Sequence, residues 1–159
     1  MTENDYLKVL EKIVSRLKDS SIAWVVTGSL GMALQGIPVQ VHDIDIQTDK
    51  DGAYGIENCF AEYLVQPVRY SESERIRSHL GVLKIDGIKA EIMGDIQKHL
   101  GDQIWEEPVK VERYRRWVEV GGKLIPVLSL EYEYQAYLKL GRIEKAEMLR
   151  SWLQKTEAG

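Results

Sequence analysis

The sequence predicts an α/β (α+β) fold that ends in a helical segment, and three observations favour this class. Apolar, β-branched runs typical of strands are interspersed with segments whose apolar residues recur at helical spacing. Turn-forming residues separate these segments, and their mixed order along the chain is typical of α/β or α+β domains. The 159 residues, 44% hydrophobic and 29% charged, suffice for a sizeable core, so we expect residues 1–159 to form one domain.

The first sixty residues predict alternating helices and strands. Residues 22–27 form an apolar, β-branched run that is typical of a buried strand. Ser29 is a good helix N-cap, so a short helix is expected to follow it and to end at Gly36 and Pro38. The expected elements are a helix over 3–19, a strand over 22–27, a short helix over 30–35, a strand over 40–48, a turn at 49–52 and an amphipathic helix over 53–63.

The rest of the chain is rich in strand patterns before it becomes helical. Asp86-Gly87 is the strongest short hairpin signal and joins two expected strands, and Gly121-Gly122 predicts a second hairpin. Ser129 is expected to cap a helix that Gly141 ends. The expected elements are strands over 65–70, 76–85 and 88–93, a short helix or loop over 95–105, strands over 117–120 and 123–127, and helices over 130–140 and 142–154.

Composition narrows the classes of partner. The net charge is −4, whereas a nucleic-acid-binding protein is more often basic, so nucleic acid is not an expected partner. The single cysteine, Cys59, allows no intrachain disulfide, which fits a reducing compartment. The first residues are acidic and lack the apolar segment of a signal peptide, and no apolar run approaches the roughly 20 residues that span a bilayer. We therefore expect a cytoplasmic protein without a membrane partner.

Asp43 and Asp45 are the most informative residues of the chain. On a strand, residues i and i+2 share a face, so the two carboxylates project together from an apolar run. Two such charges repel each other unless a cation lies between them. Mg²⁺ suits these hard oxygen ligands, and proteins usually hold it with one or two carboxylates plus substrate phosphates. The pair predicts a magnesium site that serves phosphoryl or nucleotidyl transfer, and the alternative is the polar edge of a surface strand.

Gly28 and Ser29 support the same chemistry. They follow an expected strand directly and open a helix, and the free N–H groups at a helix N-terminus bind anions. Glycine also lets a phosphate group approach the backbone closely. We therefore expect Gly28 and Ser29 to bind nucleotide phosphates beside the aspartates, and the alternative is an ordinary helix cap.

Thr27-Gly28-Ser29, followed after a spacer by Asp43-Ile44-Asp45-Ile46, resembles the signature of the nucleotidyltransferase superfamily that includes DNA polymerase beta. Within it, the chain resembles the small lincosamide and aminoglycoside nucleotidyltransferases. The resemblance covers roughly residues 20–95 by motif. It implies a mixed β-sheet flanked by helices, and a third carboxylate on a later strand, for which Glu91 is the match. It also implies basic residues near the triphosphate in the C-terminal helical segment; the candidates are Lys139, Arg142 and Lys145.

The implied reaction transfers an NMP group from a nucleoside triphosphate to a hydroxyl of a small molecule, such as an antibiotic-like acceptor, and releases pyrophosphate. Asp43 and Asp45 would bind Mg²⁺, and Glu91 would either complete a two-metal site or act as the general base. Asp86 and Asp95 are rivals of Glu91, but the first lies in a turn and the second resembles a helix cap. The basic candidates would alternatively belong to a solvated, charged helix.

Other functional classes stay open at this stage. One is a nucleotide-binding, regulatory protein of the same fold that has lost turnover. Another is a toxin–antitoxin type of nucleotidyltransferase that acts on protein or tRNA, and a third is a plain α/β domain with a chance match. Small relatives often build their site across a dimer, so a homodimer stays open by analogy.

Overall fold

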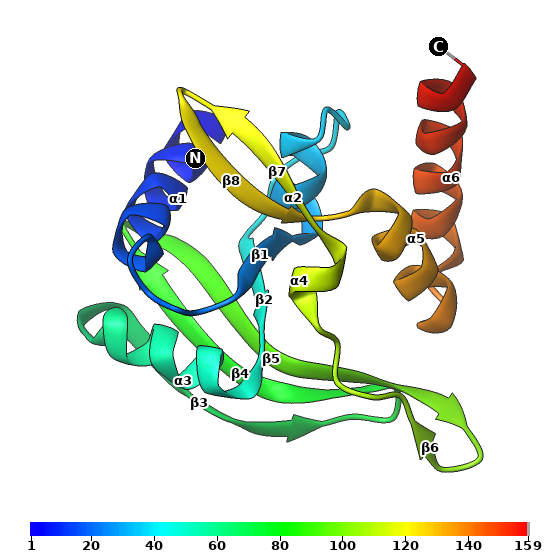
Figure 1. Ribbon diagram of the computed structural model, residues 1–159, viewed down its shortest axis with the longest axis horizontal. Coiled ribbons are helices and arrows are strands. Elements are labelled where there is room, and N and C mark those ends of the chain that lie inside the picture. The colour runs from blue at the N-terminus through cyan, green and yellow to red at the C-terminus, as the bar shows by residue number, and fades with distance from the viewer. Residues whose placement is uncertain (159) are drawn as a thin grey trace.

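The computed structural model describes residues 1–158, which form one mixed eight-stranded sheet with helices around it (Figure 1). The strands are β1 (Trp24–Thr27), β2 (Ile44–Thr48), β3 (Leu64–Glu72), β4 (Ile76–Ile85), β5 (Ile88–Gly101), β6 (Ile104–Trp105), β7 (Arg115–Val120) and β8 (Lys123–Leu128). The helices are α1 (Glu3–Leu17), α2 (Gly28–Leu34), α3 (Lys50–Cys59), the 3₁₀ turn η1 (Ala61–Tyr63), α4 (Val111–Tyr114), α5 (Leu130–Lys139) and α6 (Ile143–Ala158). Within the described range, no helix has the length and apolarity needed to cross a bilayer.

Strand β2 lies in the middle of the sheet. The strand order is β3-β4-β5-β2-β1-β8-β7, and β6 pairs with β5 off this path. Strand β2 runs antiparallel to β1 and parallel to β5, and its Asp45 stands opposite Thr27 on one side and Glu91 on the other. The strands that carry the sequence motif are therefore direct neighbours.

The main core lies on the face of the sheet that α1 and α3 cover. Ile44 and Ile46 of β2 are fully buried there, together with Ile92 of β5, and side chains of both helices pack against them. Because side chains alternate along a strand, Asp45 faces the opposite side. That side is bounded by α5, which lies beside α6 and away from α1 in Figure 1.

The first helix, both hairpins and the two C-terminal helices occur where the sequence predicts them. The prediction for residues 95–105 is wrong, because β5 continues through this segment and pairs with β6. Asp95 does not begin a helix of its own: its φ of 51° is left-handed, and the pairing with β4 shifts register beside it, between Arg77 and His79. This irregularity is typical of a β-bulge, which interrupts the alternation of a strand without ending it.

Residues 49–52, predicted as a separate turn, instead begin α3. Asp49 is the N-cap of this helix, and its Oδ1 accepts a hydrogen bond of 2.6 Å from the Gly52 N–H. The helix therefore starts three residues earlier than the turn chemistry predicts. Strand β2 is also shorter than predicted, because residues 40–43 do not belong to it and it begins at Ile44.

Gly94 lets α3 approach β5 closely, and Gly94→Ala should destabilise the fold. An added Cβ would lie 2.6 Å from the backbone oxygen of Asp49 and 2.8 Å from the Cβ of Ala53. Backbone atoms would have to shift, so we expect the free energy of unfolding to fall by about 1–3 kcal/mol in denaturant titration. Lys84→Ala, at an exposed position of the adjacent strand, is the control and should change it by less than about 0.5 kcal/mol. Equal stability of the two variants would contradict this packing argument.

Candidate functional site

The three carboxylates predicted from the sequence come together on the open face of the sheet. Asp45 on β2 stands opposite Glu91 on β5, and Asp43 lies just before β2 begins. All three line a cavity of about 330 Å³, together with Gly28. The structure therefore joins both halves of the sequence motif and the candidate third acid in one place.

The two rival acids lie elsewhere. Asp86 is in the hairpin turn, where its carboxylate forms an ion pair of 2.7 Å with Lys12. The Asp95 carboxylate accepts a hydrogen bond of 3.0 Å from the backbone N–H of Lys50 and faces a different cavity. Of the three acids that the sequence offers for this role, Glu91 is thus the one that shares the cavity with the aspartates.

Asp45 lies in an unfavourable environment for a negative charge. Burial raises the pKa of its carboxyl to about 6, and the nearby charges of Glu91 and Asp43 act in the same direction, against Lys89 and Lys145. The Glu91 carboxylate also forms an ion pair of 3.5 Å with the ammonium of Lys89, two residues before it on β5. Across residues 1–158, no three His, Cys, Asp or Glu side chains are grouped as a preformed metal site. A cation held here would need further ligands from its substrate.

The turn at Gly28 brings the backbone against Asp45. Gly28 has a φ of 68°, and a Cβ at this position would collide with the Asp45 carboxylate. The backbone conformation and the close approach of Asp45 therefore each require glycine here. The prediction that Ser29 caps the helix is wrong, because Thr27 occupies the N-cap position. The Ser29 Oγ instead accepts a hydrogen bond of 3.1 Å from the backbone N–H of His42. This bond ties the turn to the segment that leads into the two aspartates.

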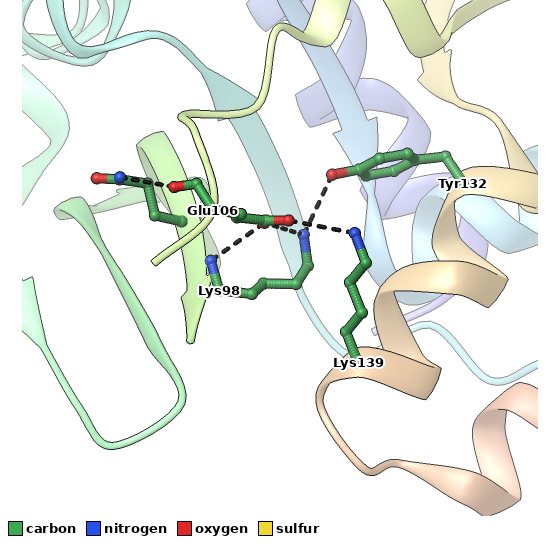
Figure 2. Close-up of polar contacts among 5 residues, drawn as sticks. Lys98, Glu106, Tyr132 and Lys139 are labelled. Atoms are coloured by element: carbon green, nitrogen blue, oxygen red, sulfur yellow. Dashed lines mark hydrogen bonds and ion pairs between the residues drawn. The ribbon is translucent and has the colours of Figure 1, made fainter. Parts of the chain in front are cut away.

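The structure does not bring the three basic candidates of the C-terminal segment to one cavity. Arg142, in the turn between α5 and α6, lines the cavity that contains Asp45. Lys145 is close enough for its charge to lower the pKa of Asp45. Lys139 instead lines a second cavity of about 790 Å³. Its ammonium forms an ion pair of 3.3 Å with the carboxylate of Glu106. Figure 2 marks this contact with a dashed line.

Lys98 is a site residue that the sequence analysis missed. It is buried yet lines the cavity of the aspartates, and its ammonium lies 2.9 Å from Glu106 and donates a hydrogen bond of 3.1 Å to the Tyr132 hydroxyl (Figure 2). If side chains alternated strictly along β5, the even-numbered residues would face away from the side on which Glu91 lies, and Lys98 would not reach the site. The bulge at Asp95 reverses this alternation, and the sequence carried no signal for it beyond a Gly-Asp pair.

Glu133 is the second missed residue. It is only 4% exposed, and its Oε1 accepts hydrogen bonds from the Thr27 hydroxyl and from the Gly28 N–H, the latter of 3.1 Å. Its Oε2 is buried and has no hydrogen-bond partner among the described residues. Burial raises the pKa of this carboxyl to about 7, the two hydrogen bonds oppose that change, and the charge of Asp45 adds to it. The signal was available, since helical spacing places position 133 on the buried face of α5.

Comparison with known proteins places this arrangement in a family. The family model described as aminoglycoside-2''-adenylyltransferase matches residues 9–150. No protein of curated function matches the chain significantly. Among solved structures, TM1012 from Thermotoga maritima, which is assigned as a nucleotidyltransferase, is 62% identical with a TM-score of 0.86, over 98% of this chain and 96% of that one.

Two more distant structures share the fold. ANT(2'')-Ia, solved in complex with adenylyl-2''-tobramycin, has a TM-score of 0.61 at 11% identity, over 97% of this chain and 94% of that one. The lincosamide antibiotic adenylyltransferase LnuA, solved with lincomycin bound, has a TM-score of 0.57 at 14% identity, over 95% and 98% of the two chains. The predicted mixed sheet with flanking helices is confirmed as a nucleotidyltransferase fold.

The raised pKa of Asp45 makes the stability of this protein depend on pH. An unfolded aspartate titrates at 3.8, whereas Asp45 in the folded protein titrates at about 6. The folded state binds the proton more tightly, so stability falls as pH rises from about 4 to about 6 and stays lower above that range. Asn cannot ionise, and Asp45→Asn should therefore raise Tm by a few degrees at about pH 8, but not at about pH 4.

The measurement is thermal unfolding in metal-free buffer with a chelator. Asp102→Asn, which changes an exposed carboxylate, is the control and should leave Tm within about a degree of the wild type at both pH values. If Asp45→Asn lowered Tm at about pH 8, the carboxylate would be stabilising, and the description of its environment would be wrong.

Proposed function

The chain belongs to the aminoglycoside-2''-adenylyltransferase family, and we propose that it is a Mg²⁺-dependent nucleotidyltransferase. It would move an NMP group from a nucleoside triphosphate to a hydroxyl of a small molecule. The observation that carries the proposal is the meeting of Asp43, Asp45 and Glu91 with the Gly28 turn around one cavity. The antibiotics bound to ANT(2'')-Ia and LnuA suggest a small, hydroxyl-bearing acceptor of that kind.

Asp43 and Asp45 would hold the Mg²⁺, and the chemistry of these donors fits the ion. Both supply hard carboxylate oxygens. Burial, together with the like charges of Glu91 and Asp43, raises the pKa of Asp45 to about 6, and a bound cation would offset this unfavourable environment for the negative charge. Two protein carboxylates completed by phosphate oxygens are a usual magnesium environment. When bound, the ion would neutralise negative charge on the phosphates of the substrate.

The protein's own residues would position the reactants. The acceptor oxygen would form a bond to the α-phosphorus while the bond from that phosphorus to the oxygen shared with the β-phosphorus breaks, and pyrophosphate would leave with the electron pair. Glu91 would accept the proton of the acceptor hydroxyl as the general base. Arg142 would attract the departing pyrophosphate, and the Gly28 turn would let the phosphates approach the backbone. Positioning and neutralisation of charge are the main sources of rate enhancement in such reactions.

Binding of nucleotide should depend on both the metal and the two aspartates. We expect Tm to rise by several degrees with at least one of ATP, GTP, CTP and UTP when Mg²⁺ is present, because a ligand that binds only the folded state stabilises it. The rise should vanish without Mg²⁺ and in the double variant Asp43→Ala/Asp45→Ala. A thermal-shift screen measures this and identifies the base preference at the same time. A rise that survives the double substitution would remove the assignment of the metal site.

The second candidate is a nucleotide-binding protein without turnover. It gains support because the Gly28 N–H already donates a hydrogen bond to Glu133 and is therefore not free to hold a phosphate for the reaction. The two candidates differ in the release of pyrophosphate. An enzyme should release it in the presence of a suitable acceptor, so a panel of aminoglycosides and lincosamides is the appropriate screen. Nucleotide binding without pyrophosphate release across such a panel would favour the silent protein.

Arg142 and Lys139 should differ in their effect on nucleotide binding. Arg142 lines the cavity of the aspartates, whereas Lys139 is engaged with Glu106 beside the second cavity. Loss of a charged hydrogen-bond donor costs about 1.5–3 kcal/mol, so Arg142→Ala should raise the Kd of the Mg²⁺–nucleotide complex about tenfold or more. Lys139→Ala should change it less than about threefold. Isothermal titration calorimetry on both variants checks this, and equal weakening would mean that the triphosphate extends toward Lys139.

A further inference from the structure

The buried carboxyl group of Glu133 lines the cavity of the aspartates, and the proposed reaction does not use this group. We propose that this carboxylate is an internal competitor of the nucleotide: it occupies the turn at Gly28 where a phosphate group would bind, and so sets the affinity for the triphosphate. The proposal rests on the proposed function, because it concerns the same site. It assigns Glu133 as a positioning residue that determines affinity, and not as a catalytic residue.

The first observation is the donor set that Glu133 takes. One of its oxygens, Oε1, accepts hydrogen bonds from the Thr27 hydroxyl and from the Gly28 N–H. A backbone N–H paired with a hydroxyl is a typical donor set for a phosphate oxygen, and the missing side chain of glycine is what lets an anion approach. The carboxylate therefore already fills an anion position of the turn.

The second observation is the other oxygen. Glu133 lines the cavity, and its Oε2 is buried. This oxygen receives no hydrogen bond from any group within residues 1–158. Leaving a buried acceptor unpaired is unfavourable. A glutamine could accept the same two hydrogen bonds through its carbonyl oxygen without a charge. A glutamine would therefore keep α5 anchored to the turn. As a neutral acceptor it would hold the two donors less strongly than a carboxylate, so a phosphate oxygen would displace it more easily.

The third observation is the balance of charge around the cavity. Asp43, Asp45 and Glu91 already line it, so Glu133 adds a fourth carboxyl group to a site that we propose accepts a triphosphate. Arg142 lies in the turn that follows the helix carrying Glu133. The same helical segment thus presents one group that opposes the triphosphate and one that attracts it.

The test compares Glu133→Gln with the wild type and with Glu131→Gln, which makes the same charge change at an exposed position of α5. Calorimetry at about pH 8 measures the Kd of the Mg²⁺–nucleoside triphosphate complex, of inorganic tripolyphosphate and of the free nucleoside. Glu133→Gln should lower the Kd of both phosphate-bearing ligands about tenfold, since a like charge beside the phosphates is removed. It should leave the Kd of the nucleoside unchanged, and Glu131→Gln should leave all three unchanged.

The outcomes separate this inference from the proposed function. If the wild type binds the triphosphate and Glu133→Gln binds it equally or more weakly, the competitor role is wrong and the proposed function stands. If neither protein binds triphosphate or tripolyphosphate, the proposed function fails and the inference with it. A gain that extends to the nucleoside would mean a general loosening of the fold and would also overturn the inference. Glu133→Leu removes the charge without burying a new polar group and should give the same gain, so a folding defect of one variant does not decide the result.

Discussion

The pairing of β2 between β1 and β5 is the constraint on which the site depends. It places Thr27, Asp45 and Glu91 side by side on three adjacent strands. Ile44 and Ile46 hold this register, because they are fully buried on the other face of the same strand. A slip by one residue would move Asp45 into the core and an isoleucine into the cavity. The hydrophobic core and the arrangement of carboxylates are therefore two results of a single alternation along β2.

The features that the sequence predicts correctly are local. Two aspartates at i and i+2, a glycine directly after an apolar strand and a Gly-containing hairpin each carry their structural meaning within a few residues. The choice of Glu91 as third carboxylate came from the resemblance, whereas the Asp86-Gly87 hairpin determines which face of the returning strand it occupies. Because β5 then pairs with β2 in parallel, the third carboxylate reaches the first two.

The features that the sequence does not predict depend on contacts between distant segments. Lys98 reaches the cavity only because a bulge at Asp95 reverses the alternation of β5, and a Gly-Asp pair is too weak a signal to predict that bulge. Ser29 looks like a helix cap, but its hydroxyl is taken by a backbone N–H thirteen residues further along the chain. Lys139 is near Arg142 in sequence, yet the end of α5 directs the two side chains to different cavities.

The charges of the cavity suggest how metal and nucleotide would depend on each other. Lys98 is already neutralised by Glu106, so among residues 1–158 the other cations beside the carboxylates are those of Lys89, Arg142 and Lys145. Three cations do not balance four carboxyl groups, and a bare triphosphate would add further negative charge. A bare Mg²⁺ would in turn find no group of three acidic or imidazole ligands within residues 1–158. Each would supply what the other lacks, because phosphate oxygens complete the coordination of the ion and the ion offsets the charge of the phosphates. The site is therefore suited to the magnesium–nucleotide complex as a unit and poorly suited to either component alone.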